Sequence, residues 1–461
     1  MKVLSRKNVD ILSGNLVKNI MLYAFPVMMA QILQGLYNAA DTIIVGRYGS
    51  QEALSGVGSA GSLTALLYTF LLGLSSGASV VMGRALGAGD GKAVHRTLHT
   101  AMLISVISGA VVAIGGQFAA ELALRMIDVP PNVMPHAVAY TKIVLLGKLP
   151  SFIYSFGAGI AHANGDSRTP LILSASTGIL NVLLNLLFVC VFHMDAAGVA
   201  WATTIVQFVN AVCIIFVLRR GYGDNCRLYF KKLKIYKKQF INILRIGIPV
   251  GIQSSVLNFA NVTIQSAVNS FGSTAIINAG AAAANIEVFF NLVQAGFASA
   301  TTVFVSQNAG AKQYGRIRSI LFTSLGFEAV IWAAEVLLII CGAETLIGIY
   351  IPNDAEAIRI GVTRLFIVGL TYGVSGFRDV FASALRALGY STSVMLISVI
   401  GICGTRILWV YTVFPMTGTY ESLIMAFPVS IIITCLINAV MFILVYRSIM
   451  AKQIYYERIY Q

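Results

Sequence analysis

Long apolar runs, each of about 20 residues or more, follow one another along most of this 461-residue chain. Hydrophobic residues make up 57% of the sequence and charged residues only 11%, whereas a soluble domain carries about a quarter charged residues. Lipid cannot satisfy free backbone groups, so segments that cross it must be helices or strands of a closed barrel. Continuous apolar runs indicate helices, because barrel strands are short and alternate apolar with polar residues. The sequence therefore predicts an all-α polytopic membrane protein.

The apolar runs predict 12 transmembrane helices. Their approximate bounds are 17–46, 53–85, 94–124, 134–161, 168–193, 197–219, 240–269, 276–307, 317–342, 356–386, 393–415 and 421–447. Several exceed the ~20 residues needed to cross a bilayer, so we expect tilted or protruding helices. Pro26 and Pro249 lie inside two of these runs and are expected to bend them.

Lysine and arginine residues, which give the net charge of +14, lie mainly in alternate loops between the apolar runs. Lys2, Arg6 and Lys7 precede the first run, and the segment 219–238 is strongly basic. The intervening loops "HMDAAG" and "NSFGST" contain no Lys or Arg. Positive loops face the cytoplasm, so the pattern predicts a multi-pass protein of the cell (inner) membrane with both termini cytoplasmic. This clustering argues against nucleic-acid binding; we expect a monomer whose environment is the lipid bilayer.

The two halves of the chain resemble each other. The stretch "FPVMMAQILQGLYNAAD" aligns with "IPVGIQSSVLNFANVTI", so that Pro26 meets Pro249 and Asn38 meets Asn261. Six runs are duplicated, and because six is even both copies keep the same orientation. The repeat predicts two six-helix bundles related by a pseudo-two-fold axis along the membrane normal, with a substrate route between them. We expect an N-terminal lobe over 1–218, a basic cytoplasmic linker over 219–238, and a C-terminal lobe with a short cytoplasmic tail over 239–461.

The repeat also separates residues that the bundle requires from residues particular to one half. Asp41 aligns with Ile264, so the second half has no acid at this position. Three more polar residues of the first half align with residues of a different kind in the second half: Asn181, Asn185 and Thr203. The first run carries further polar side chains at helical spacing from Asp41, namely Gln34, Tyr37 and Asn38.

The carboxylate, amide and hydroxyl oxygens of Asp41, Asn181, Asn185 and Thr203 are hard ligands that could bind Na⁺. The same environment could instead let the carboxyl alternate between protonated and ionised forms. An ionised side chain within the membrane costs several kcal/mol on insertion scales (roughly 2.5–3.5), which favours a functional role for Asp41. The structural alternative is a polar contact that holds helices together.

The second half contains unmatched acids of its own. We favour a functional role for Glu287, whereas Asp379 follows Arg378 directly and fits an internal ion pair equally well. For Glu328 and Glu335 we favour a structural role. Four basic residues within the runs are candidate partners for carboxylates: Lys142, Lys148, Arg364 and Arg406. Spacing in the sequence does not decide which pairs form.

The chain carries no pattern that indicates an enzyme. "GRALGAGDGKA" is rich in glycine, but Leu86 occupies the first glycine position of a phosphate-binding loop and Ala93 replaces its Ser or Thr. We therefore expect no catalytic residues and no organic cofactor. H⁺ or Na⁺ is expected as a coupling ion.

Several motifs together resemble the multidrug and toxic compound extrusion (MATE) family. They are "NAADTIIVGRYGS", "GLSSGASVVMGRALGAGD", "NGDSRTP", "GILNVLLNLLFV" and "GVAWATT", and the resemblance covers about residues 15–450. It implies 12 helices in two lobes and efflux of organic, often cationic compounds coupled to inward H⁺ or Na⁺ flow. The family's cation site would correspond to Asp41, Asn181, Asn185 and Thr203, and Glu287 resembles an acidic position of a bacterial subgroup. Some members have Asp at the position of Asn185, so the coupling ion stays open.

We thus expect a secondary active antiporter that exports cationic or amphipathic small molecules by alternating access. The alternative is a flippase or exporter of lipid-linked saccharides from the same superfamily. That function requires a large basic cavity for a diphosphate, whereas the positive charges here lie mostly in loops.

Overall fold

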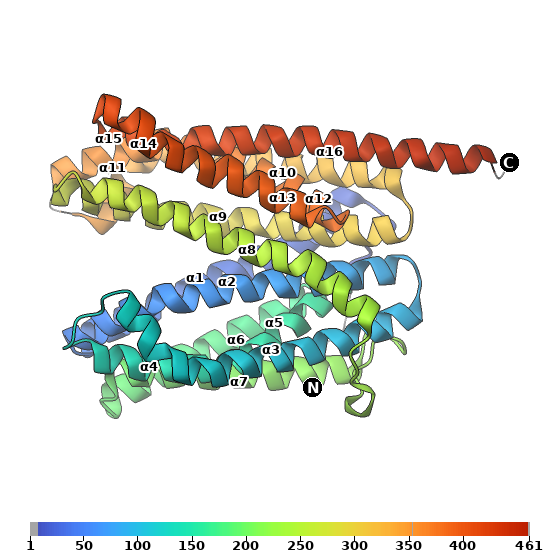
Figure 1. The fold of residues 1–461 in the computed structure, drawn as a ribbon, viewed down its shortest axis with the longest axis horizontal. Coiled ribbons are helices and arrows are strands. Elements are labelled where there is room, and N and C mark those ends of the chain that lie inside the picture. Colours follow the sequence, from blue (N-terminus) through green and yellow to red (C-terminus); the bar gives the residue numbers. More distant parts are fainter. Residues whose placement is uncertain (1–7, 353, 460–461) are drawn as a thin grey trace. The chain divides into compact units, whose positions relative to one another are not determined.

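The computed structural model describes residues 8–352 and 354–459, and within these ranges the chain forms helices and no strands (Figure 1). Lys2, Arg6 and Lys7 lie outside the described residues. The described residues include 11 helices that are long and apolar enough to cross a membrane, or 12 if one bent pair counts as a single span. The predicted all-α polytopic fold class is confirmed.

The chain forms two compact units. The N-terminal unit consists mainly of Phe25–Gly251, and the C-terminal unit of Ile11–Ala24 with Ile252–Gln461. Two long helices, α1 (Leu16–Tyr48) and α8 (Lys237–Asn269), each contribute to both units. The change of unit falls next to Pro26 in α1 and close to Pro249 in α8. The predicted lobes, 1–218 and 239–461, instead place all of α1 in the first lobe and all but the first two residues of α8 in the second.

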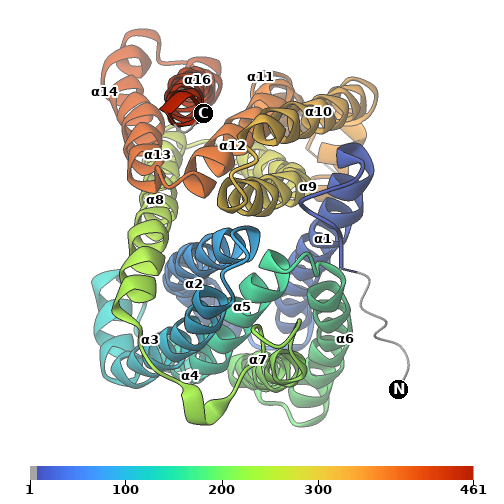
Figure 2. The same cartoon turned by 90° about the vertical axis from the view of Figure 1, so that its right-hand side faces the viewer.

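Apart from parts of α1 and α8, the described part of the N-terminal unit is built from six helices joined by short connections. They are α2 (Gln51–Gly87), α3 (Gly91–Met126), α4 (Met134–Leu146), α5 (Lys148–Ala163), α6 (Arg168–Asn185), which continues as a π-helical segment (Leu186–Val191), and α7 (Asp195–Arg220). Its apolar core includes Leu71, Leu98 and Phe156, each with no exposed surface. In Figure 2, which looks along the helices, α5 packs beside α2, α3 and α7.

The C-terminal unit repeats much of this pattern. Its helices are α9 (Thr274–Gly310), α10 (Tyr314–Tyr350), α11 (Ala355–Ile367), α12 (Tyr372–Ala387), α13 (Ser391–Ser398), α14 (Thr405–Thr417), α15 (Tyr420–Ile424) and α16 (Ala426–Ile459). Helices α2 and α9 both have 37 residues, α4 and α11 both have 13, and α5 and α12 both have 16. α12 packs beside α9 and α10 as α5 packs beside α2 and α3. The internal sequence repeat thus corresponds to a repeat of helices.

The predicted span 134–161 is formed by two helices, α4 and α5, which meet at an angle of 43°. The bend falls at Gly147, which separates the two helices. The Oγ1 atom of Thr204 donates a hydrogen bond of 3.0 Å to the carbonyl oxygen of Ile143, in the last turn of α4. Pro150 lies in the first turn of α5, where its missing N–H costs nothing. The bend is therefore supported by a side chain from α7 and by the placement of a proline.

Glycines allow α2 and α8 to cross closely within the N-terminal unit. A Cβ atom at Gly77 would lie 3.0 Å from Cα of Gly247, and one at Gly247 would lie 2.8 Å from Cα of Leu74. A real Cβ atom cannot lie this close to a backbone atom, so both positions require glycine unless the helices move apart. Small residues four apart are a common means of bringing membrane helices together.

We expect Gly77→Leu to destabilise the N-terminal unit. The larger side chain must push α8 away from α2, and overpacking of this kind costs about 1–3 kcal/mol. Gly115→Leu is the matched control, because a Cβ atom at Gly115 would meet nothing within 4 Å. Thermal unfolding in detergent should show a lower Tm for Gly77→Leu and an unchanged Tm for the control. Equal Tm values would contradict the close crossing.

Candidate functional site: a polar cavity in the N-terminal unit

The N-terminal unit contains a partly open cavity of about 420 Å³ lined by residues of α1, α2, α4, α5 and α7. A smaller pocket of about 70 Å³ is lined by α1, α2, α5, α6 and α7. Asp41, Gln34, Asn38 and Thr203 line both. The prediction that Gln34, Asn38 and Asp41 lie on one face of a helix is consistent with this, and Thr203 of α7 lines the same pockets.

Asp41 is joined to two asparagines of α6. The Nδ2 atom of Asn185 donates a hydrogen bond to Oδ1 of Asp41 and lies 3.3 Å from Oδ1 of Asn181. Asn185 has no exposed surface, and its own Oδ1 atom has no hydrogen-bond partner among the described residues. The predicted set of Asp41, Asn181, Asn185 and Thr203 is thus gathered at one place, with an amide oxygen left to accept from a further group.

The sequence motif "NGDSRTP" fixes the start of α6 and so helps to position these asparagines. Asp166 Oδ1 accepts a hydrogen bond of 2.9 Å from the backbone N–H of Thr169, and its Oδ2 accepts one of 2.8 Å from the hydroxyl of Tyr222. At its other end α6 changes into the π-helical segment directly after Asn185. Such π-helical turns occur frequently at functional sites.

Tyr37 lies against α6. Its hydroxyl donates a hydrogen bond of 3.2 Å to the carbonyl oxygen of Ala175. Its ring occupies the space that a side chain at Gly178 would need, so glycine is required there for α1 to approach α6. Tyr37 therefore supports the packing beside the pocket as well as lining it.

Several polar residues of the site were not predicted from the sequence. Gln207 and Asn210 line it from α7, and Oγ1 of Thr177 lies 3.1 Å from Oδ1 of Asn210. Thr203, Gln207 and Asn210 have the spacing i, i+4, i+7, the same pattern that drew attention to α1. That signal was present in the sequence. Ser151 and Ser155 line it from α5 and are also four residues apart, and Tyr68 lines it from α2.

Glu287, a candidate for a site in the C-terminal unit, is paired with an arginine. Its two carboxylate oxygens accept hydrogen bonds of 2.9 and 3.0 Å from Nε and Nη2 of Arg364. Both residues are 5% exposed. This geometry satisfies the carboxylate and the guanidinium fork together.

Asp379 is likewise paired, with Arg378, through two hydrogen bonds of 3.0 Å. No hydrogen bond or ion pair among the described residues joins Asp379 to Glu287. Glu335 accepts from Nε2 of Gln294, at 3.1 and 3.2 Å from its two oxygens. Glu328 is 1% exposed, and its carboxylate has no hydrogen-bond partner among the described residues. A role for Glu287 and Asp379 in cation binding stays a prediction.

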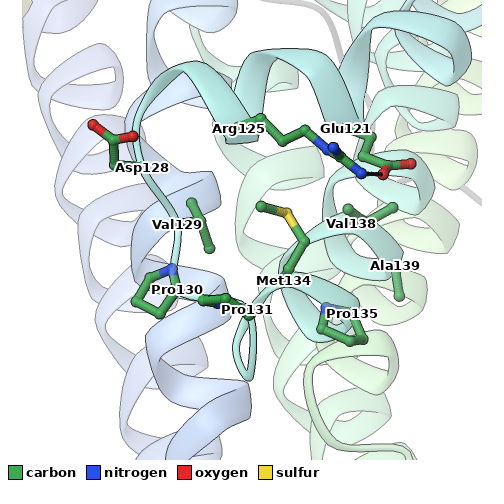
Figure 3. A pocket seen from close by; sticks show the side chains of 10 residues that line it. All are labelled: Glu121, Arg125, Asp128, Val129, Pro130, Pro131, Met134, Pro135, Val138 and Ala139. Carbon is green, nitrogen blue, oxygen red and sulfur yellow. Dashed lines mark hydrogen bonds and ion pairs between the residues drawn. The ribbon is translucent and has the colours of Figure 1, made fainter.

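A third hollow, of about 850 Å³, lies where α3 connects to α4 (Figure 3). Pro130, Pro131 and Pro135 line it together with the exposed ion pair of Arg125 and Glu121, whose atoms are 2.7 Å apart. It contains none of the predicted site residues. The cavity around Asp41 is therefore the candidate site.

A polytopic helical chain built from two repeats has the architecture of a secondary transporter. The family model MatE matches residues 26–187 and 249–412. The chain belongs to the multidrug and toxic compound extrusion (MATE) family of efflux transporters, as its sequence motifs predict. It is a transporter and not an enzyme.

Relatives and solved structures agree with this assignment. The chain is 23% identical to the probable multidrug resistance protein YoeA of Bacillus subtilis, over 90% of this chain and 92% of that protein. It is 27% identical to the probable multidrug resistance protein NorM of Thermotoga maritima, over 85% and 84% of the two chains. A MATE family transporter in an outward-facing conformation superposes with a TM-score of 0.89 at 18% identity, covering 97% of this chain and 99% of that one.

Proposed function

We propose that the protein is a secondary active antiporter, which exports cationic or amphipathic organic compounds in exchange for inward H⁺ or Na⁺. The observation that carries this proposal is that Asp41 and Thr203 line the cavity, while Asn185 and Asn181 are joined to Asp41 by hydrogen bonds behind it. A volume of about 420 Å³ lies within the usual range for small-molecule sites, about 300–1,000 Å³. The family and the names of the multidrug resistance relatives support an organic substrate.

Asp41 is the residue that exchanges the coupling ion in this proposal. Its carboxylate accepts from Asn185 and keeps further lone pairs for a proton or Na⁺. The unpartnered Oδ1 of Asn185 and the hydroxyl of Thr203 are oxygen donors of the kind that Na⁺ takes. The donor set therefore suits either ion.

Ion and substrate compete in this mechanism. The coupling ion and a cationic group of the substrate are both attracted to the negative charge of Asp41. Binding of one of them from one side of the membrane therefore displaces the other. Each ligand shifts the same two-state equilibrium between inward-facing and outward-facing forms by its differential affinity. Because only one of the two ligands is bound at a time, the substrate leaves the cell as the ion enters it.

Purified protein in liposomes tests this function and identifies the ion. Ethidium uptake into vesicles is followed by fluorescence under an imposed pH gradient, an imposed Na⁺ gradient, or neither. We expect uphill movement with one of the two gradients and only equilibration with neither. Uphill movement without any ion gradient, or no movement in any condition, would contradict the proposal.

The flippase alternative is not favoured. A lipid-linked diphosphate would need several cationic side chains in the cavity, whereas Lys148 is the one Lys or Arg among the described residues that line it. The relatives named above are multidrug resistance proteins, which also supports export of small molecules.

A further inference from the structure

Lys148 is the second charged residue of the cavity that holds Asp41. It is the first residue of α5, is half-buried, and lines the cavity of about 420 Å³. Its Nζ atom lies 5.9 Å from the centroid of the Tyr68 ring. Among the described residues no carboxylate forms an ion pair with Lys148. The cavity therefore carries one acid and one base that are not paired with each other.

The fold does not require a lysine at this place. α5 and α12 are matching helices of 16 residues, and the first residue of α12 is Tyr372, which has no charge at neutral pH. The bend before α5 is supported by Thr204 and by Gly147, not by the ammonium group. Lys148 is thus particular to the N-terminal unit, as Asp41 is.

An ammonium group in a partly dehydrated cavity gains from an anionic partner. A π-face at nearly 6 Å gives only a weak attraction, whereas a carboxylate offers a charge-assisted hydrogen bond. An organic cation, in contrast, meets repulsion from Lys148 when it enters the same cavity. The cavity therefore favours a compound that carries a carboxylate beside its cationic group over a compound that is only cationic.

We propose that Lys148 binds the carboxylate of zwitterionic amphiphiles whose cationic group lies at Asp41. This inference rests on the proposed antiport and names its preferred substrate class. The coupling ion competes with the substrate's cationic group at Asp41, while Lys148 keeps the carboxylate end in place. Compounds that carry both charges bind better than cations of the same skeleton.

Two dyes that differ by one ester test the inference. Rhodamine 110 carries a free carboxylate, and rhodamine 123 is its methyl ester. We expect the detergent-purified protein to bind rhodamine 110 about fivefold more tightly or better, as measured by fluorescence anisotropy. Lys148→Met should bring the two Kd values within about twofold of each other, and Lys148→Arg should keep the preference.

Lys142→Met is the matched control, because Lys142 lies on the neighbouring α4 and does not line the cavity. It should leave the ratio of the two Kd values unchanged. Equal binding of both dyes by the native protein, absent binding of both, or a preference that survives Lys148→Met would overturn the inference. Gradient-driven ethidium transport, measured on the same protein, reports separately on the antiport itself.

Discussion

Asp41→Asn is expected to reduce gradient-driven ethidium transport to the level of protein-free liposomes. Asparagine has nearly the shape of aspartate, and its Oδ1 atom can still accept the hydrogen bond from Asn185. It cannot take up a proton, and it has no charge with which to attract Na⁺ or an organic cation. The variant should therefore fold and insert, with a Tm close to that of the native protein, yet fail to couple the two fluxes.

Glu344→Gln is a suitable control for this prediction. It makes the same carboxylate-to-amide change at an exposed position of α10 in the other unit. Transport by this variant should equal that of the native protein. Undiminished uphill transport by Asp41→Asn would show that the coupling ion binds elsewhere.

Substitutions in the buried ion pair of Glu287 and Arg364 are expected to lower the stability of the protein. Removing one partner of a buried ion pair leaves the other charge without compensation, at a cost of about 3–5 kcal/mol. Arg364→Met and Glu287→Gln should each lower the Tm markedly. The double variant Glu287→Met/Arg364→Met should be more stable than Arg364→Met alone, because it leaves no buried charge unpaired.

The exposed pair of Glu121 and Arg125 supplies the comparison. Their side chains are 48% and 68% exposed, so Arg125→Ala should change the free energy of unfolding by less than about 1 kcal/mol. A normal Tm for Glu287→Gln, together with lost transport, would instead assign Glu287 to the coupling of ion and substrate.

Much of the fold could be predicted because its strongest determinant is local. Apolar runs long enough to cross a bilayer identify the helices, and duplication of those runs identifies the repeat. The break between α4 and α5 was not predicted, because Pro150 lies after the bend and Gly147 is an ordinary residue in an apolar run. The contact of Thr204 with Ile143 that supports the bend joins residues 61 apart in sequence.

The site was predicted in part for a related reason. Asp41 and Asn185 stood out because the second half lacks them, and they do meet in space. The partner of Glu287 could not be chosen, since Arg364 lies 77 residues away and sequence spacing carries no distance between separate helices. The sequence indicates Lys148 only as a partner for a carboxylate of the protein. A role in binding a substrate depends on the cavity that it lines, and this cavity exists only in the folded chain.

The most direct test of coupled exchange at Asp41 is the movement of the ion itself. Liposomes containing the protein are given an outward ethidium gradient, with no initial gradient of H⁺ or Na⁺, and internal pH and Na⁺ are followed with trapped indicators. We predict that ethidium leaving the vesicles drives one of the two ions inward, and that Asp41→Asn abolishes this inward movement. Movement of the ion in the same direction as ethidium, or inward movement that persists in Asp41→Asn, would contradict the account.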